Sequence, residues 1–241
     1  RFLPALFYIL LYSIFRQHQL LNPALRAGIF LILAIMRIMD SYRKQGFASN
    51  FFDAGLLIST GTLFYSDLIW FALIIFLGMI SLRRVNLSEI FAAITGLVTP
   101  LLITAGIYFI LEKDPVMFLS GIFKGLLISI PALPLERFTM ILLIIVAVIV
   151  LISLFHLLAG INSKKIKSRK TFNILIWTLI FSVTLYFTVP SISTEIMWLA
   201  SIPASYLLSH YFVFTAKKTI TRIIFTGLFI FFLLVQLMYF I

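Results

Sequence analysis

Residues 138–158, FTMILLIIVAVIVLISLFHLL, decide the class of fold. This stretch is 21 residues long and contains no Asp, Glu, Lys or Arg. A helix of that length extends over about 31 Å at about 1.5 Å per residue, which matches the roughly 30 Å hydrocarbon core of a bilayer. A helix that is apolar on every side is either deeply buried or in contact with lipid. We therefore interpret residues 138–158 as a membrane-spanning helix.

The rest of the chain repeats this pattern. Of its residues, 62% are hydrophobic and 11% are charged, against roughly 45–50% and about 25% in soluble domains. We predict an all-α fold, a polytopic transmembrane helical bundle of about nine passes that forms a single transmembrane domain over residues 1–241. Because the chain starts at Arg1 within an apolar stretch, without Met, we expect that it lacks an N-terminal portion of the native chain. The predicted passes are 2–15, 23–39, 51–64, 68–82, 87–111, 138–158, 171–189, 193–215 and 221–241.

The distribution of Lys and Arg predicts the orientation. Cytoplasmic loops of membrane proteins are enriched in these residues, so we place the most basic loop inside. It follows the quoted helix and contains Lys164, Lys165, Lys167, Arg169 and Lys170. Alternating the nine passes then puts 14 basic residues inside and five outside. We predict a protein of the cell inner membrane, with Arg1 cytoplasmic and Ile241 periplasmic.

The basic loop has two interpretations. It acts as a topology determinant, or it also binds anionic lipid head groups, at about 1 kcal/mol per charge. In a soluble protein, a net charge of +11 would indicate binding to nucleic acid. Here the enrichment of Lys and Arg in cytoplasmic loops explains the charge, so we expect no nucleic-acid partner.

The segments 51–64 and 68–82 are short, with 14 and 15 residues. These two segments have three interpretations. They form two half-length helices that meet at Tyr65-Ser66-Asp67, one long kinked element, or two full passes in which polar flanking residues extend both helices. A helix break at membrane depth is tolerated against protein or a wet cavity, so this is the first place to look for a functional vestibule. Asp67 at the break is a weak catalytic candidate, and the alternative is a solvated loop carboxylate.

Residues 115–130 form a further apolar stretch, PVMFLSGIFKGLLISI, which carries Lys124. We predict an interfacial or re-entrant helix on the outer face, because another full pass would invert every later loop. Asp114 before Pro115 predicts its N-cap, and Asn86 with Glu89 predicts a capping box for the pass that begins at residue 87.

Other ionisable residues have less specific interpretations. Outer-side basic residues are candidates for binding a lipid phosphate or for interfacial anchoring. We interpret Asp53 as a helix-start acid, Arg37 as a snorkelling residue and His156 as a helix–helix hydrogen-bond partner. The lipid-phosphate candidates are Arg16, Arg26, Lys124 and Arg137, with His18 and Lys113 nearby.

Residues 51–100 carry a resemblance to a known family. The features are FDAGLLI at the start, LFY before the break, the pair Arg83-Arg84, the Asn-x-x-Glu cap and Gly-x-x-x-Pro in the next helix. The chain resembles an uncharacterised family of polytopic integral membrane proteins from the Bacteroidota, a domain of unknown function. The same module is similar in topology to polyprenyl-phosphate-dependent glycosyltransferases of the C fold. That likeness implies catalysis by an acidic residue in a first outer loop, which would lie upstream of Arg1. The glycosyltransferases have a Gly-Leu-x-x-Gly-like helix before the break, whereas this chain has Ser59-Thr60-Gly61 in place of the second Gly. No catalytic residue is therefore carried over.

Three functions fit this sequence. The first is an accessory or scaffold subunit of a cell-envelope membrane complex, with membrane lipids and other membrane protein subunits as partners. The second is a glycosyltransferase-like enzyme acting on a lipid-linked polyprenyl phosphate substrate at the outer face, and the third is a transporter. The chain has no Cys, three scattered His and no catalytic or nucleotide motif, so we expect no metal site and no cofactor.

Overall fold

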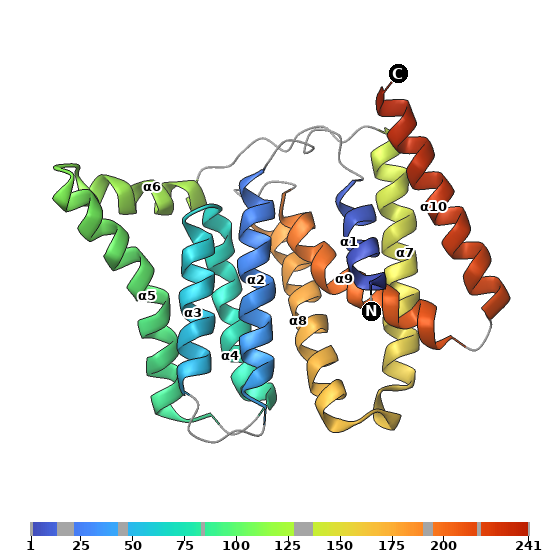
Figure 1. The fold of residues 1–241 in the computed structure, drawn as a ribbon, viewed down its shortest axis with the longest axis horizontal. Coiled ribbons are helices and arrows are strands. Elements are labelled where there is room, and N and C mark those ends of the chain that lie inside the picture. Colours follow the sequence, from blue (N-terminus) through green and yellow to red (C-terminus); the bar gives the residue numbers. More distant parts are fainter. Residues whose placement is uncertain are drawn as a thin grey trace. The chain divides into compact units, whose positions relative to one another are not determined.

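The computed structural model describes residues 2–13, 22–42, 48–82, 85–127, 137–189, 195–215 and 218–240. Ten α-helices and two short 3₁₀ helices make up the regular structure of this part of the chain (Figure 1). The α-helices are α1 (Leu3–Tyr12), α2 (Pro23–Asp40), α3 (Ala48–Thr62), α4 (Ala72–Leu82), α5 (Leu87–Ile110), α6 (Pro115–Leu127), α7 (Arg137–Ala159), α8 (Ile166–Thr188), α9 (Ile196–Phe214) and α10 (Lys218–Phe240). The 3₁₀ helices are η2 (Ser66–Phe71) and η3 (Ile161–Ser163).

The predicted all-α class is confirmed. Each of the nine predicted segments overlaps one α-helix, and the tenth α-helix, α6, falls in the stretch predicted to be interfacial. Among the described residues, four helices are long and apolar enough to cross a bilayer. They are α5, α7 from Met140 onward, α8 and α9, while α1 and Ser66–Leu82 are shorter apolar helices. The number of nine passes remains a prediction.

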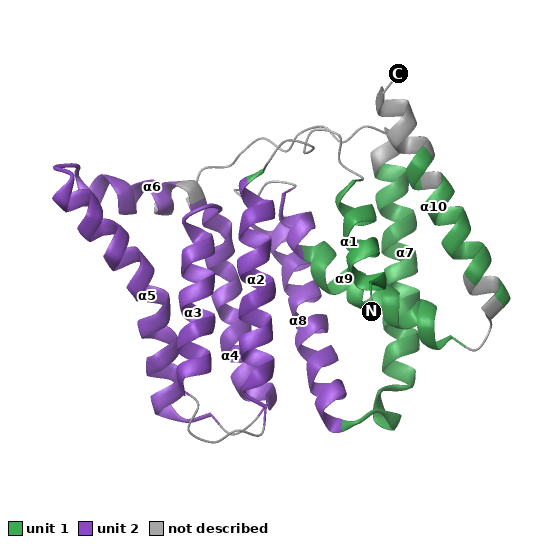
Figure 2. Ribbon diagram, in the orientation of Figure 1, with its two compact units in different colours: residues 1–22, 133–165, 200–241 green, residues 23–132, 166–199 purple. Residues whose placement is uncertain are grey.

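The chain divides into two compact units (Figure 2). Unit 1 comprises residues 1–22, 133–165 and 200–241, and therefore holds α1, α7, η3, α10 and most of α9. Unit 2 comprises residues 23–132 and 166–199, with α2 to α6 and α8. Each unit is built from segments far apart in sequence, so both depend on long-range contacts.

In unit 2, α3 and α4 are separate helices that lie side by side (Figure 1). The backbone N–H groups of Phe64 and Tyr65 both donate to the carbonyl of Gly61 at 3.0 Å, which closes α3. Tyr65 is extended (φ −142°, ψ 104°), and η2 starts at the next residue. A Cβ at Gly61 would collide with Leu68 of η2 and lie 3.0 Å from Phe30 of α2, so glycine lets η2 fold back onto α3. The single kinked element is thus excluded, which leaves the two alternatives with separate helices.

Helices α3 and α5 cross with their backbones in contact. A Cβ on Gly55 would lie 2.5 Å from the carbonyl oxygen of Ala93, and one on Gly96 would collide with the backbone of α3. The buried residues of α5 are Glu89, Ala93, Gly96 and Pro100, a stripe of helical spacing. This stripe ends at Pro100, and in Figure 1 the second half of α5 leans away from α3.

Asn86 and Asp114, the two residues predicted to cap helices, both accept a backbone hydrogen bond at a helix start; the reciprocal bond of the capping box, from Glu89, stays a prediction. The Asn86 side chain accepts a hydrogen bond from the N–H of Ser88 at 3.4 Å, which caps α5. Asp114 Oδ1 accepts from the N–H of Val116 at 2.8 Å, directly before the first turn of α6. Each bond satisfies a backbone donor that the helix itself leaves unpaired.

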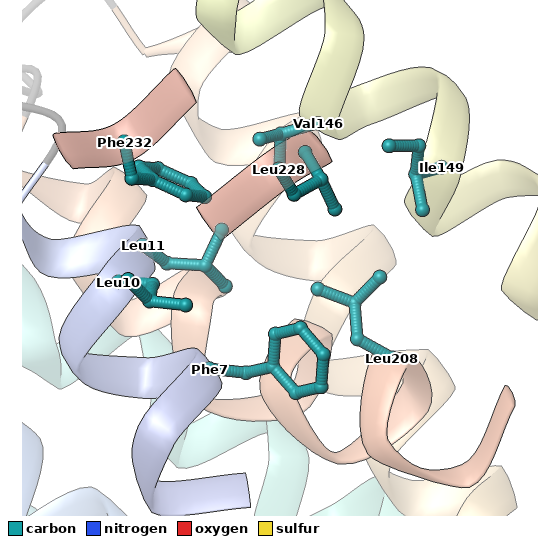
Figure 3. Close-up of a pocket in the computed structure, with 8 residues that line it drawn as sticks. All are labelled: Phe7, Leu10, Leu11, Val146, Ile149, Leu208, Leu228 and Phe232. Atoms are coloured by element: carbon teal, nitrogen blue, oxygen red, sulfur yellow. The ribbon is translucent and has the colours of Figure 1, made fainter. Parts of the chain in front are cut away.

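Unit 1 is held by aromatic and aliphatic contacts. Phe7 of α1 stacks on Phe212 of α9 at a centroid distance of 5.1 Å, and meets Phe225 of α10 edge-on at 5.8 Å. Beside this cluster lies a gap that holds no more than about one water-sized group, too small for a ligand. Its side chains face one another in Figure 3, and they are Phe7, Leu10, Leu11, Val146, Ile149, Leu208, Leu228 and Phe232.

Candidate functional site

The helix break in unit 2 holds a buried carboxylate. Asp67 lies in the first turn of η2 and is only 5% exposed. The Tyr65 side chain hydrogen-bonds to this carboxyl group, while Asp67 Oδ1 is buried and has no hydrogen-bond partner among the described residues. A buried polar atom without a partner costs about 1–3 kcal/mol. Asp67 is therefore not the solvated loop carboxylate of the second interpretation.

Two other polar atoms, one on α3 and one on η2, are also unsatisfied. Ser59 Oγ, on the last turns of α3, and Trp70 Nε1, on η2, are both buried without a hydrogen-bond partner in the described structure. Helix α3 packs against η2, which brings these two segments together. Glu195, before α9, lies close enough to interact electrostatically with Asp67. Helix α3 and η2 thus carry a carboxylate oxygen, a hydroxyl and an indole N–H that have no hydrogen-bond partner among the described residues.

Helix α6 passes beside the break. It packs against η2 and against α5, and Figure 1 shows it running crosswise to α3 at one end of that helix. Its start is anchored by aromatic contacts, because Tyr108 of α5 lies 4.7 Å from the ring of Phe118 and the Lys113 ammonium lies 5.9 Å from the Tyr108 centroid. Lys124 on α6 is exposed.

The structure describes only some of the residues that are predicted to bind a lipid phosphate. Arg26, at the start of α2, is exposed, and its guanidinium lies 5.3 Å from the ring centroid of Phe64, next to the break. Arg16 lies outside the described residues, as does the side chain of Arg137 at the start of α7. The gathering of these basic residues around one phosphate stays a prediction.

The comparisons with known proteins identify a family. A model for a family of unknown function, DUF6427, matches residues 1–241. The chain belongs to this family. The predicted resemblance to an uncharacterised family is thereby confirmed, whereas the likeness of DUF6427 to glycosyltransferases remains a prediction. Neither a curated protein nor a solved structure matches the chain.

In this DUF6427 member, charged and polar contacts join the helices of unit 2 at the ends that lie away from the break. Arg37 Nε lies 3.5 Å from Asp53 Oδ2, joining α2 to α3. Asp53 is not in the first turn of α3, so the helix-start interpretation is wrong, because α3 begins at Ala48. Lys170 of α8 donates to the backbone carbonyl of Ser81 near the end of α4, and Asn173 Nδ2 donates to Ser81 Oγ at 2.9 Å.

The basic loop has an exposed part and a partly buried part. Lys165, Lys167 and Arg169 are exposed, whereas Lys170 and Lys164 are half-buried. Lys164 is less exposed than its neighbour Lys165, because Lys164 Nζ lies 2.6 Å from Nε2 of His210 in α9. Among the described residues, no three His, Asp or Glu side chains lie close enough together to hold a metal ion.

Proposed function

We propose that this DUF6427 chain is a multi-pass inner-membrane protein of about nine passes, with its more basic side in the cytoplasm. Arg1 is then cytoplasmic and Ile241 periplasmic. Contacts inside unit 2 support this alternation, because they join residues that it assigns to one side. Arg37 with Asp53 and Lys170 with Ser81 both belong to the predicted inner side, and the helix break and α6 both belong to the outer side.

Within the membrane, the chain acts as an accessory subunit of a cell-envelope complex. The observation that carries this role is the α5–α6 arm, residues 101–127, which follows Pro100. Only 17% of the apolar window of α5 is buried, and none of the buried residues of α5 lies beyond Pro100. Helices associate in lipid through close packing at small residues, and this part of α5 presents Thr104 and the open surface at Gly106. The arm is suited to pack against a helix of a partner subunit.

Photocrosslinking tests this role. We expect a photoreactive residue in place of Ile107 on the arm to yield a discrete crosslinked protein band in native membranes. Ile180 of α8 is the matched control, because Ile107 is 49% exposed and Ile180 is 45% exposed. Ile180 should give lipid adducts alone. The accessory role is contradicted if Ile107 also gives lipid adducts alone while the purified chain is a monodisperse monomer.

A second candidate function rests on Asp67. Asp67 Oδ1, the Ser59 hydroxyl and the Trp70 indole N–H have no hydrogen-bond partner among the described residues, and these groups match the hydroxyl groups of a sugar. This set supports an enzyme that acts on a sugar carried by polyprenyl phosphate at the outer face. Arg26 and Lys124, both exposed in unit 2, are suited to bind the phosphate. The variant Asp67→Asn, which removes the carboxylate but keeps its size, decides between this function and the accessory role.

A further inference from the structure

Helices α5 and α6 are joined by a fixed corner. The N–H of Lys113 donates to the carbonyl of Tyr108 at 2.9 Å, and Glu112 has a φ of 57°, the left-handed conformation in which many helices end. The next residue but one, Asp114, accepts a bond from a backbone N–H of α6 at 2.8 Å. Across the corner, the rings of Tyr108 and Phe118 lie 4.7 Å apart. Backbone bonds and side-chain packing therefore hold the end of α5 and the start of α6 together.

The two halves of α5 are held differently on either side of Pro100. Before Pro100, the buried stripe of α5 packs against α3, and at Gly96 the two backbones are in contact. After Pro100, none of the described side chains at residues 101–127 is buried. A segment without buried contacts moves at a lower free-energy cost than the core to which it is joined. The α5–α6 arm is therefore attached at one end and weakly held along the rest of its length.

Pro100 is the point at which α5 can bend. Proline has no N–H, so the helical bond to the carbonyl of Gly96 is missing, and sharp helix bends concentrate at such positions. The hydroxyl groups of Thr99 and Thr104 donate to carbonyl groups four residues earlier, at 2.6 and 2.8 Å, and Thr side chains bonded in this way also bend helices. Ile110 lies about 15 Å beyond Pro100 along the axis, so a change of about 20° in direction moves it by about 5 Å.

The far end of the arm lies against the segment that carries Asp67. Helix α6 packs on η2, and Asp67 of η2 is buried, with its Oδ1 atom unpartnered among the described residues. Helices α2, α3 and α4 also pack on η2, but each of them contributes buried residues to unit 2, whereas no described side chain of α6 is buried. A ligand reaches a buried group when a covering element moves away, and α6 is the neighbour of η2 that moves at the lowest cost.

We propose that the α5–α6 arm moves as one rigid body about Pro100, and that this movement lifts α6 from η2 and opens the segment around Asp67. The rigid corner transmits a bend at Pro100 to α6, while the contact of Gly96 with α3 keeps the first half of α5 in place. The hinge rests on the geometry of α5 and α6 alone. The purpose of the opening, access of a sugar to Asp67, rests on the second proposed function.

Distances between paired spin labels in the full chain in lipid nanodiscs test the hinge. The chain has no Cys, so pairs of Cys substitutions carry the labels. The exposed positions Ile80 of α4 and Met117 of α6 span the hinge, whereas Phe109 and Met117 both lie in the arm. We expect the distance distribution across the hinge to be wider by about 5 Å than the distribution within the arm, and Pro100→Ala to remove this difference. Equal widths in the wild type, or an unchanged difference in Pro100→Ala, overturn the hinge.

The reaction of Asp67→Cys with N-ethylmaleimide tests the opening. We expect this buried thiol to react, and to react about fivefold more slowly when Pro100→Ala is added, because the regained helix hydrogen bond contributes roughly 1 kcal/mol. Glu112→Cys, exposed in the turn after α5, is the control, and its rate should not change. No reaction at Asp67→Cys, or a rate that Pro100→Ala leaves equal or raises, overturns the opening. Neither measurement uses a sugar, so a failure of the proposed sugar-binding function is recognised separately.

Discussion

Replacement of Gly96 by Leu is expected to prevent accumulation of the folded protein. At this position, α5 lies against the backbone of α3, and a Cβ would collide with the carbonyl group of Phe52 and lie 3.1 Å from the nitrogen of Leu56. Backbone atoms cannot rotate away as a side chain does, so the helices must separate along the whole crossing. We expect a loss of about 3 kcal/mol or more of unfolding free energy. The loss is large because close approach is a main source of helix association in lipid.

The matched control is Gly106→Leu in the same helix. No atom lies within 4 Å of a Cβ placed at Gly106, so this variant should fold with a change of at most about 0.5 kcal/mol. The readout is the amount of monodisperse protein after extraction in mild detergent, together with its unfolding midpoint. A folded Gly96→Leu protein with an unchanged midpoint would show that the α3–α5 crossing is wrong.

Asp67→Asn is expected to separate stability from function. The amide keeps the size of the carboxyl group but is cheaper to bury, so we expect the unfolding midpoint to stay the same or to rise by a few degrees. Loss of the carboxylate should lower binding of a polyprenyl-phosphate sugar at least about tenfold, because bonds to charged groups contribute about 1.5–3 kcal/mol. Thermal shift with and without the lipid-linked sugar measures both quantities.

Glu112→Gln provides the comparison for Asp67. Glu112 is also a carboxylate on the predicted outer side, but it is exposed and lies in the turn after α5. Its substitution should leave both the midpoint and the binding unchanged. Full binding and full activity in Asp67→Asn would remove the enzyme alternative, and a marked loss of stability would identify Asp67 as a structural residue.

Much of the fold could be predicted because it depends on local properties of the chain. Apolar stretches predicted the ten α-helices, since apolar segments have few other stable forms in lipid, whereas the 3₁₀ helices η2 and η3 were not predicted. Asn86 and Asp114 identified helix starts through side chains that reach backbone donors two residues later. The break at Tyr65-Ser66-Asp67 was visible as a polar interruption between two short apolar segments.

The contacts within the sites were not predictable, because they join residues far apart in sequence. Lys164 and His210 are 46 positions apart, and Lys170 and Ser81 are 89 positions apart. The proximity of Glu195 to Asp67 is likewise a consequence of packing within unit 2. Helix starts also shift with context, since α3 begins at Ala48, three residues before the apolar segment.

Cysteine labelling tests the oriented, multi-pass arrangement most directly. The chain has no Cys, so each single-cysteine variant reports one position without background. Four exposed positions suffice: Lys113 and Lys124 on the predicted outer side, and Lys165 and Arg169 on the predicted inner side. In cells with an intact inner membrane, a membrane-impermeant maleimide should label Lys113→Cys and Lys124→Cys, and should label Lys165→Cys and Arg169→Cys only after the membrane is disrupted. Labelling of Lys165→Cys and Arg169→Cys in intact cells would contradict the proposed topology.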